Sequence, residues 1–148
     1  MLLVKHILVI LHIITAAAWF GLALPLGRRA RVIAAGGPEA APLAEEGSRV
    51  VRLLGIFSIL TFVFSLAAFL VGGGFAGYGP QYHTSLLLIV ALVGVQYGLI
   101  RPGWEALRVG DASGKKRVAM GAGIGHTLWL VILVLMFWTK LSVALQTM

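Results

Sequence analysis

Long apolar stretches alternate with short polar and glycine-rich segments along the whole chain. A helix needs roughly 20 apolar residues to cross a hydrocarbon core about 30 Å thick, because it rises only about 1.5 Å per residue. Four stretches reach this length with at most one lysine or arginine each, so each is predicted to be a transmembrane helix. They cover about residues 2–26, 50–71, 82–100 and 118–145.

The segments between these stretches contain the residues that usually interrupt helices. Arg101-Pro102-Gly103 is expected to end the third helix, because proline lacks a backbone N–H and glycine is a poor helix former. A short surface helix is expected at Ala40–Glu46. The pattern predicts a single all-α membrane domain over residues 1–148, a four-transmembrane-helix bundle with both termini on one side. The predicted loops are 27–49, 72–81, which is glycine-rich, and 101–117.

The composition supports a membrane protein and excludes a soluble one. Hydrophobic residues make up 59% of the chain and charged residues only 11%. A soluble globular domain carries about 25% charged residues, because its surface must face water. A soluble enzyme and a disordered chain are therefore excluded, and the apolar surface is expected to face a lipid bilayer.

Lysine and arginine are distributed unequally between the two predicted faces. The positive-inside rule places the first and third loops in the cytoplasm and both termini outside, in a bacterial-type cytoplasmic (inner) membrane. All five acidic residues also lie on the cytoplasmic side, so the net charge of +7 indicates topology and not nucleic-acid binding. The ten cytoplasmic-side basic residues are Arg28, Arg29, Arg31, Arg49, Arg52, Arg101, Arg108, Lys115, Lys116 and Arg117, against Lys5 and Lys140 outside.

The four histidines are the candidates for metal chemistry, because the absence of cysteine excludes thiolate sites and covalent haem attachment. His12 and His126 lie within predicted spans, where ionisable residues are costly and usually face the bundle interior. Imidazole is the usual axial ligand of haem iron, and four-helix bundles hold cofactors between facing helices. The helical rise places His12 about 10 Å and His126 about 21 Å below the outer interface. His6 and His83, near that interface, form a second pair at matching depth.

Further candidates surround the two intramembrane histidines. Trp19 shares a helix face with His12 and offers either a flat ring beside a cofactor or ordinary packing. Gly121 and Gly125 leave the fourth helix nearly bare just before His126, which suits either a flat macrocycle or close helix packing through a GxxxG pair. For every histidine the alternative is a structural hydrogen bond.

The third predicted helix contributes two adjacent polar residues, Gln96 and Tyr97. They are candidates to bind a quinone or a haem propionate. Interhelical hydrogen bonding is the alternative for both.

The most specific motif lies in the first predicted helix. It combines Leu11-His12-Ile13-Ile14, Trp19-Phe20-Gly21-Leu22, Leu24-Pro25 and Arg28. This stretch resembles the opening helix of the HemJ-type protoporphyrinogen IX oxidases, small four-helix membrane proteins that bind haem b, and of the related CopD-type copper-resistance membrane proteins. A histidine, a tryptophan-x-glycine and a basic residue after leucine-proline recur there at about this spacing. The resemblance implies that His12 is a haem ligand.

Two motifs of the HemJ-type pattern are replaced in this chain. The lysine at the head of the third helix is missing, and Gln81-Tyr82-His83-Thr84-Ser85 stands there. The Asn-Glu-x-Pro stretch of the last helix is also missing, with Gly125-His126-Thr127 in the corresponding region. Both replacements bring in a histidine, so haem binding ranks above protoporphyrinogen oxidation.

The leading hypothesis is a haem-b-binding membrane redox protein that transfers electrons, with His12 and either His126 or His83 as axial ligands and one or two haems. A quinone or a redox partner in the membrane would exchange electrons with it. Oxidation of protoporphyrinogen IX is the first alternative. Copper binding by His6 and His83 ranks lower, because the four methionines form no outer cluster with those two histidines. A structural subunit is a further alternative, and such a small bundle is expected to form a homo-oligomer or join a membrane complex.

Overall fold

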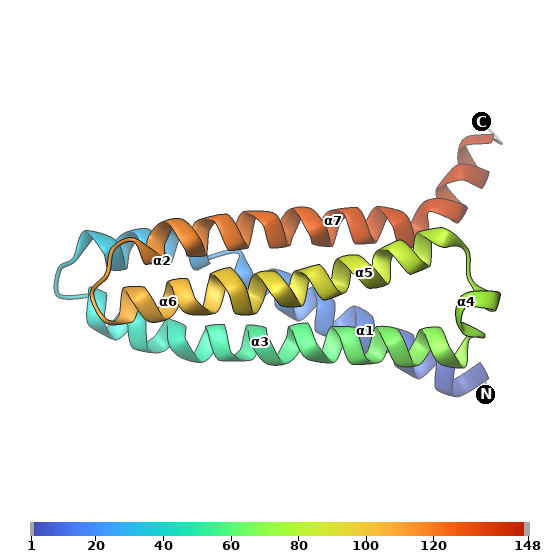
Figure 1. The fold of residues 1–148 in the computed structure, drawn as a ribbon, viewed down its shortest axis with the longest axis horizontal. Coiled ribbons are helices and arrows are strands. Elements are labelled where there is room, and N and C mark those ends of the chain that lie inside the picture. The colour runs from blue at the N-terminus through green and yellow to red at the C-terminus, as the bar shows by residue number, and fades with distance from the viewer. Residues whose placement is uncertain (1, 147–148) are drawn as a thin grey trace.

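The computed structural model describes residues 2–146, with side chains up to residue 138, and this part of the chain is almost entirely helical. Within it, four helical segments are long and apolar enough to cross a membrane. They lie side by side along one long axis (Figure 1). The predicted all-α bundle of four spans is thus confirmed. The segments are Leu2–Ala35, Ala40–Val71, Pro80–Arg108 and Gly114–Trp138.

The two ends of the bundle differ in what they contain. One, here called the terminal end, holds both ends of the described chain together with the short helix α4 (Gly74–Gly77) (Figure 1). The opposite loop end holds the connections at residues 36–39 and 109–113. Each span contains an apolar stretch of 18 residues, and at most 33% of any such stretch is buried. Most of these side chains therefore face outward, as contact with lipid requires. The assignment of the loop end to the cytoplasm stays a prediction from the basic residues. Of the two basic residues predicted outside, Lys140 has a side chain that lies outside the described residues.

The first span consists of α1 (Leu2–Ala23) and α2 (Leu26–Ala35), so much of the predicted loop 27–49 is helical. Pro25 lies at the junction and lacks a backbone N–H. Because the N–H groups at the start of a helix have no intrahelical partner, α2 loses no hydrogen bond. α2 forms because its apolar residues recur at helical spacing and pack inward, while the basic residues between them stay at the surface. The buried residues of α2 are Leu26, Ala30 and Ile33.

The predicted surface helix and the second predicted span form one continuous helix, α3 (Ala40–Val71). Pro42 lies in its first turn, where a helix tolerates proline. Beyond it, buried residues recur every three or four positions, so a single stripe faces the bundle from the loop end inward. These residues include Ala44, Gly47, Val51, Leu54, Ser58 and Thr61.

The third span does not end at Arg101-Pro102-Gly103 as predicted. It runs from α5 (Pro80–Val95) through a π-helical turn, η1 (Gln96–Ile100), into α6 (Arg101–Arg108). The Arg101 N–H donates to the carbonyl of Gln96, five residues back, so the widened turn lets Pro102 follow without a break. Gly103 serves close packing, since a Cβ there would lie 2.8 Å from the Cβ of Arg117 on α7.

The fourth span, α7 (Gly114–Gln146), begins four residues before the predicted position 118. The Asp111 carboxylate precedes it and accepts hydrogen bonds from the Ser113 N–H and hydroxyl, both at 2.9 Å. These two bonds lower the pKa of Asp111 below its ordinary value, and Arg117 adds a smaller effect in the same direction.

We expect the structure of this connection to depend on the charge of Asp111. A carboxyl with a lowered pKa stabilises the fold fully above its ordinary pKa, and the contribution is lost as the pH falls through the lowered value. Titration by NMR should give a midpoint for Asp111 below that of aspartate in an unfolded peptide, with the Ser113 amide shift following it. Asp111→Asn should abolish that titration of Ser113. A midpoint at or above the ordinary value would contradict the assignment.

The main hydrophobic core lies toward the loop end. Trp19, Leu54, Ile100 and Trp104 belong to one buried cluster there, and the Trp104 indole N–H donates to the carbonyl of Ala44 at 3.1 Å. Buried polar side chains, including His12, accompany this core farther along the bundle. His12 and its polar neighbours thus lie between this core and the terminal end.

Candidate metal centre

His12 is the buried histidine of the described part of the chain, with only 5% of its surface exposed. α1 places it opposite α3, where its Nδ1 lies 3.1 Å from the carbonyl oxygen of Thr61. A carbonyl can only accept a hydrogen bond, so Nδ1 carries the proton and Nε2 of the neutral ring keeps its lone pair. Metal-binding histidines typically donate their second ring N–H to a carbonyl or carboxylate in this way.

Two threonines hold the helices on either side of this imidazole. The Thr61 hydroxyl donates to the Thr15 hydroxyl at 3.1 Å. Thr15 in turn donates to the carbonyls of Leu11 and His12, at 2.9 and 3.0 Å. Because the same residue of α3 both accepts from the ring and bonds to α1, the orientation of the ring is fixed by the packing of the two helices.

A small cavity of about 80 Å³ lies beside His12. All four spans contribute residues to its wall, which combines apolar residues with two serines, two tyrosines, one histidine and one methionine. The methionine is Met136 on α7, so a histidine and a methionine line the same cavity. The lining residues are Val9, His12, Ser65, Ala68, Phe69, Tyr78, Tyr82, Ser85, Leu86 and Met136.

The sequence did not single out Met136 as a ligand. It lies more than 120 positions from His12, and only the packing of the bundle brings both residues to one cavity. Both residues lie in the outer halves of the first and last apolar stretches. A comparison of metal-binding residue types at similar depth in the predicted spans was therefore the signal that pointed to them. Met1 and Met148 lie outside the described residues.

The residue types that line the cavity suit haem iron, but the cavity is smaller than a typical cofactor pocket. An imidazole and a thioether are an established pair of axial ligands for haem iron. Pockets for cofactors and drug-sized ligands measure about 300 to 1,000 Å³, whereas this cavity measures about 80 Å³. In this structure the space beside His12 is therefore smaller than the pockets that usually hold a cofactor.

His126 lies in a different part of the bundle from His12. Its Nε2 is 3.4 Å from the carbonyl of Phe20, and its ring packs edge-on against the Phe20 ring with 4.7 Å between centres. Phe20 follows His12 by about two helical turns, or roughly 12 Å along α1. The structure thus keeps the difference in depth that the sequence indicated and does not bring the two histidines to one metal.

Trp19 occupies the space that the glycines of α7 leave open. It is fully buried, and a Cβ at Gly125 would overlap its ring. A Cβ at Gly121 would lie 2.7 Å from Cγ1 of Ile100 in η1. Both glycines therefore allow close contact between helices, as in other GxxxG pairs, and side chains of Trp19 and Ile100 lie against them.

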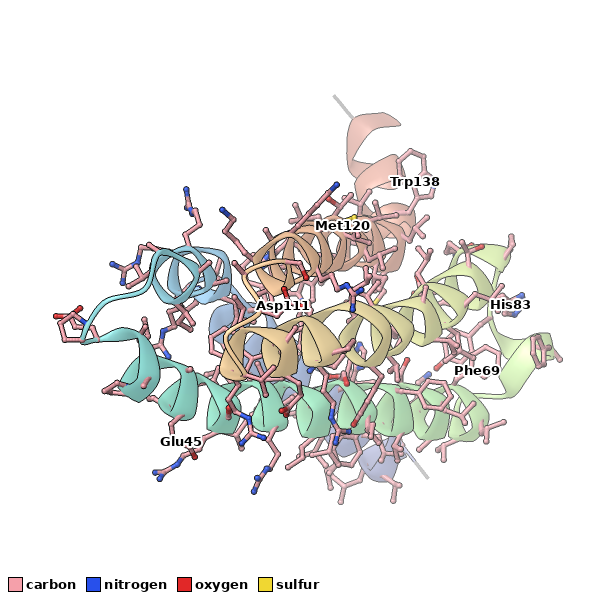
Figure 2. The ribbon with its side chains drawn as sticks, turned by 60° about the vertical axis from the view of Figure 1, so that its left-hand side comes forward. Glu45, Phe69, His83, Asp111, Met120 and Trp138 are labelled. Carbon is pink, nitrogen blue, oxygen red and sulfur yellow. The ribbon has the colours of Figure 1, made fainter. Side chains whose placement is uncertain are left out.

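His6 and His83 have separate surroundings at the terminal end. His6 is exposed and its Nδ1 lies 2.8 Å from the carbonyl of Leu2. His83 packs against Phe69 and Phe75, with ring centres 5.6 and 4.9 Å apart, and Figure 2 shows it beside Phe69. Across the described residues, no group of three or more histidine, cysteine, aspartate or glutamate side chains is arranged to hold a metal ion.

Tyr97 lies away from the His12 cavity. It belongs to η1, more than three helical turns beyond Ser85 along the same span. The guanidinium of Arg101 lies 5.8 Å from the centre of its ring. A role for Tyr97 beside the metal centre is therefore not supported by its position.

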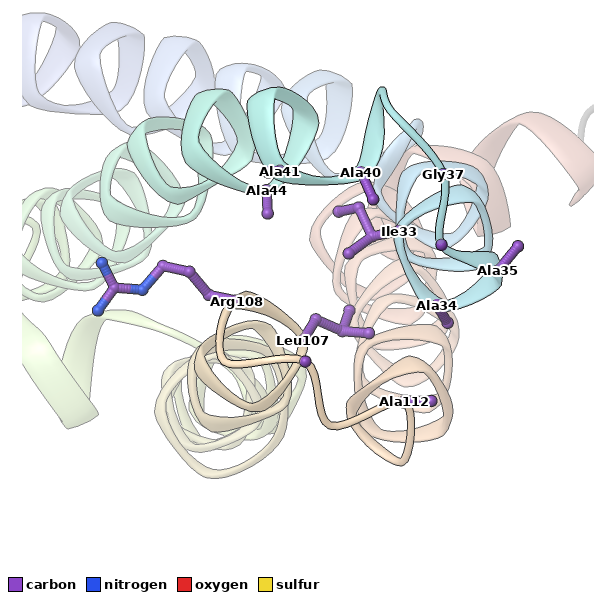
Figure 3. Close-up of a pocket in the computed structure, with 12 residues that line it drawn as sticks. Ile33, Ala34, Ala35, Gly37, Ala40, Ala41, Ala44, Leu107, Arg108 and Ala112 are labelled. Atoms are coloured by element: carbon purple, nitrogen blue, oxygen red, sulfur yellow. The ribbon is translucent and has the colours of Figure 1, made fainter.

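A larger cavity, of about 410 Å³, lies at the loop end between α2, the start of α3 and the α6–α7 connection (Figure 3). Alanines and glycines form most of its wall. Arg108 is its one charged lining residue, and in Figure 3 its side chain points away from Ile33. This cavity offers little chemistry and is not a candidate catalytic or metal site.

No protein-family model matches the chain, and searches of curated proteins and of solved structures give no significant match. The resemblance of the first helix to HemJ-type and CopD-type proteins therefore rests only on its sequence motif. The chain is a multi-pass helical membrane protein with four spans, and its function has to be argued from the His12 cavity.

Proposed function

We propose that the chain is a copper-handling membrane protein that binds one Cu(I) ion in the cavity beside His12. Nε2 of His12 is the imidazole ligand and the thioether of Met136 is the second protein ligand. The observation that carries this proposal is the hydrogen bond from Nδ1 of His12 to Thr61, which leaves Nε2 with a free lone pair in a residue that lines a cavity together with Met136.

The chemistry of the donors favours Cu(I) among common biological metals. Thioether sulfur is a soft ligand that selects Cu(I), and imidazole binds it as well. Hard cations such as Mg²⁺ and Ca²⁺ take oxygen ligands that usually include at least one carboxylate, and the lining of this cavity contains no carboxylate. The volume of about 80 Å³ suits an ion with one or two water molecules, each of which occupies about 30 Å³.

Each lining group has a separate task in this proposal. The Thr61 carbonyl keeps the His12 ring in the tautomer that binds a metal, so little reorganisation accompanies binding. The apolar groups limit access of water and of oxidants. Tyr78, Tyr82 and the two serines provide hydroxyl groups for a bound water molecule.

A second candidate function is binding of haem b for membrane electron transfer. The observation that favours it is the cation at the edge of the cavity: Nζ of Lys5 lies 5.1 Å from the ring centre of Tyr78, which lines the cavity. A lysine at this position is a suitable partner for a haem propionate, and His12 with Met136 is a known pair of axial ligand types. The helices would have to separate to admit the macrocycle, so this candidate ranks second.

Two measurements on the purified protein decide between these functions. Under reducing conditions, titration with Cu(I) against a chromophoric chelator is expected to show one ion bound per chain. The absorption spectrum should then show no Soret band. A Soret band with sharp α and β bands would favour haem b instead, and a colourless protein that binds no Cu(I) would overturn both functions.

Met136→Leu is expected to weaken Cu(I) binding by about tenfold or more. The change keeps nearly the same volume, so packing is preserved while the sulfur is lost. Loss of a contact that only supports a ligand already costs about 10- to 100-fold in metal affinity. The control is Met120→Leu, since Met120 is exposed and lies outside the cavity. Equal affinities for both variants would remove Met136 from the site.

A further inference from the structure

A second polar site lies on the opposite half of the bundle from the His12 cavity. A groove of about 480 Å³ runs between α3 and the η1–α6 part of the third span. Its wall contains three arginines, two glutamates and a tyrosine next to apolar residues. The lining residues are Glu45, Ser48, Val51, Arg52, Gly55, Ile56, Gln96, Tyr97, Arg101, Glu105 and Arg108.

The unpaired charges of the groove are mainly positive. Arg108 forms an ion pair with Glu105 at 3.1 Å, which neutralises both side chains. Arg52 and Arg101 have no carboxylate within ion-pair distance among the described residues. The groove thus contains two guanidinium groups outside any ion pair of the described part of the chain and one such carboxylate, that of Glu45, so it favours a ligand with a single negative charge. Guanidinium groups bind phosphate oxygens particularly well.

The inner wall of the groove contains an unsatisfied acceptor. Gln96 is fully buried, and its Nε2 donates to the carbonyl of Val51 at 3.1 Å. Its Oε1 has no hydrogen-bond partner among the described residues. A buried acceptor without a donor is unfavourable, so a ligand that brings a hydroxyl or an amine to Gln96 would gain affinity.

The groove opens toward the lipid. Ile56 and Tyr97, which line it, are both exposed on the surface of membrane-spanning helices. The arginines lie nearer the loop end of the same helices, where interfacial basic side chains meet lipid headgroups. A ligand with acyl chains can therefore reach the groove from within the bilayer, with its polar part directed to the arginines.

We propose that this groove binds one phospholipid with a monoanionic phosphodiester and a hydroxyl-bearing headgroup, as in phosphatidylglycerol. Arg52 and Arg101 bind the phosphodiester, and a headgroup hydroxyl donates to Oε1 of Gln96. The acyl chains lie against the lipid-facing side of Ile56 and Tyr97. Phosphatidylcholine has neither the net charge nor a donor and is a poor ligand.

Native mass spectrometry of the full chain, released from detergent after titration with single lipids, tests this site. Phosphatidylglycerol is expected to form a one-to-one complex at concentrations where phosphatidylcholine does not. Phosphatidylmethanol, which keeps the phosphodiester and lacks the hydroxyl, should bind about fivefold more weakly than phosphatidylglycerol. Equal binding of phosphatidylglycerol and phosphatidylcholine would overturn the proposal, and equal binding of phosphatidylmethanol would remove Gln96 from it.

A pair of double variants locates the complex on the chain. Arg52→Gln with Arg101→Gln is expected to weaken phosphatidylglycerol binding about 30-fold, because each interfacial arginine contributes about fivefold. Arg28→Gln with Arg31→Gln removes the same charge from exposed positions of α2 and should leave binding nearly unchanged. If both double variants lost the same affinity for phosphatidylglycerol, the effect would come from overall charge, and the proposed binding site would be contradicted. Glycerol 3-phosphate in the buffer should not compete, and effective competition would show that the groove binds soluble phosphate esters.

Discussion

His12→Ala is expected to weaken Cu(I) binding by about 100-fold or more, which in a chelator competition amounts to loss of the bound ion. Metal affinity falls by about 10- to 100-fold when only a residue supporting a ligand is removed, so removal of the ligand itself should cost at least as much. The remaining thioether of Met136 cannot hold the ion alone. The measurement is a competition titration of the purified variant under reducing conditions.

The matched control for this change is His126→Ala. Both variants remove an imidazole from a membrane-spanning helix, but the His126 ring packs against Phe20 and Trp19 and is not part of the cavity. His126→Ala should therefore keep the Cu(I) affinity of the unchanged protein. Helical content measured by circular dichroism shows whether each variant is folded. If the His12 variant is folded and binds Cu(I) normally, the proposed ligand is wrong.

Gly125→Val is expected to lower the free energy of unfolding by about 2 to 3 kcal/mol. Added carbon atoms at this position would overlap the Trp19 ring, which is fully buried and cannot swing out without leaving a void. Forcing extra methyl groups into a packed contact typically costs about 1 to 3 kcal/mol. Here the clash separates α1 from α7, which are also joined by the Trp129 indole N–H donating to the carbonyl of Ala16. Unfolding in lipid bicelles, followed by steric trapping, gives the free energy.

Gly123→Val is the control for the glycine substitution. It lies two residues away on the same helix, and a Cβ there would meet no atom within 4 Å. The two variants share the change in helix propensity and differ only in packing. If both lose the same free energy, the Trp19 contact is not what selects glycine at position 125.

The sequence predicted the number and the type of the spans because their length and apolarity depend on the bilayer alone. It also singled out His12 as a candidate ligand, and the structure buries this residue between α1 and α3. The end of the third helix was predicted wrongly at Arg101-Pro102-Gly103. Proline usually breaks a helix, but the π turn before it, and the packing of Gly103 on α7, depend on tertiary contacts that the local pattern does not contain.

The candidate site was only partly predictable for a similar reason. Trp19 and the glycines at 121 and 125 were expected to be either cofactor contacts or packing residues, and their contacts are those of helix packing. Met136 and His12 line one cavity only because of the way all four spans pack together. Periodicity indicates which face of a helix is buried, but it does not indicate which residues of two distant helices share a cavity.

The central claim is that Nε2 of His12 is free to bind a metal while Nδ1 keeps its proton on Thr61. Nitrogen-15 NMR of the histidine rings tests it directly, with His12 assigned by its absence in His12→Ala. The account predicts a protonated Nδ1 and an unprotonated Nε2 at neutral pH, and a large shift of Nε2 alone when one equivalent of Cu(I) is added. An unprotonated Nδ1, or a His12 ring whose signals do not respond to Cu(I), would contradict it.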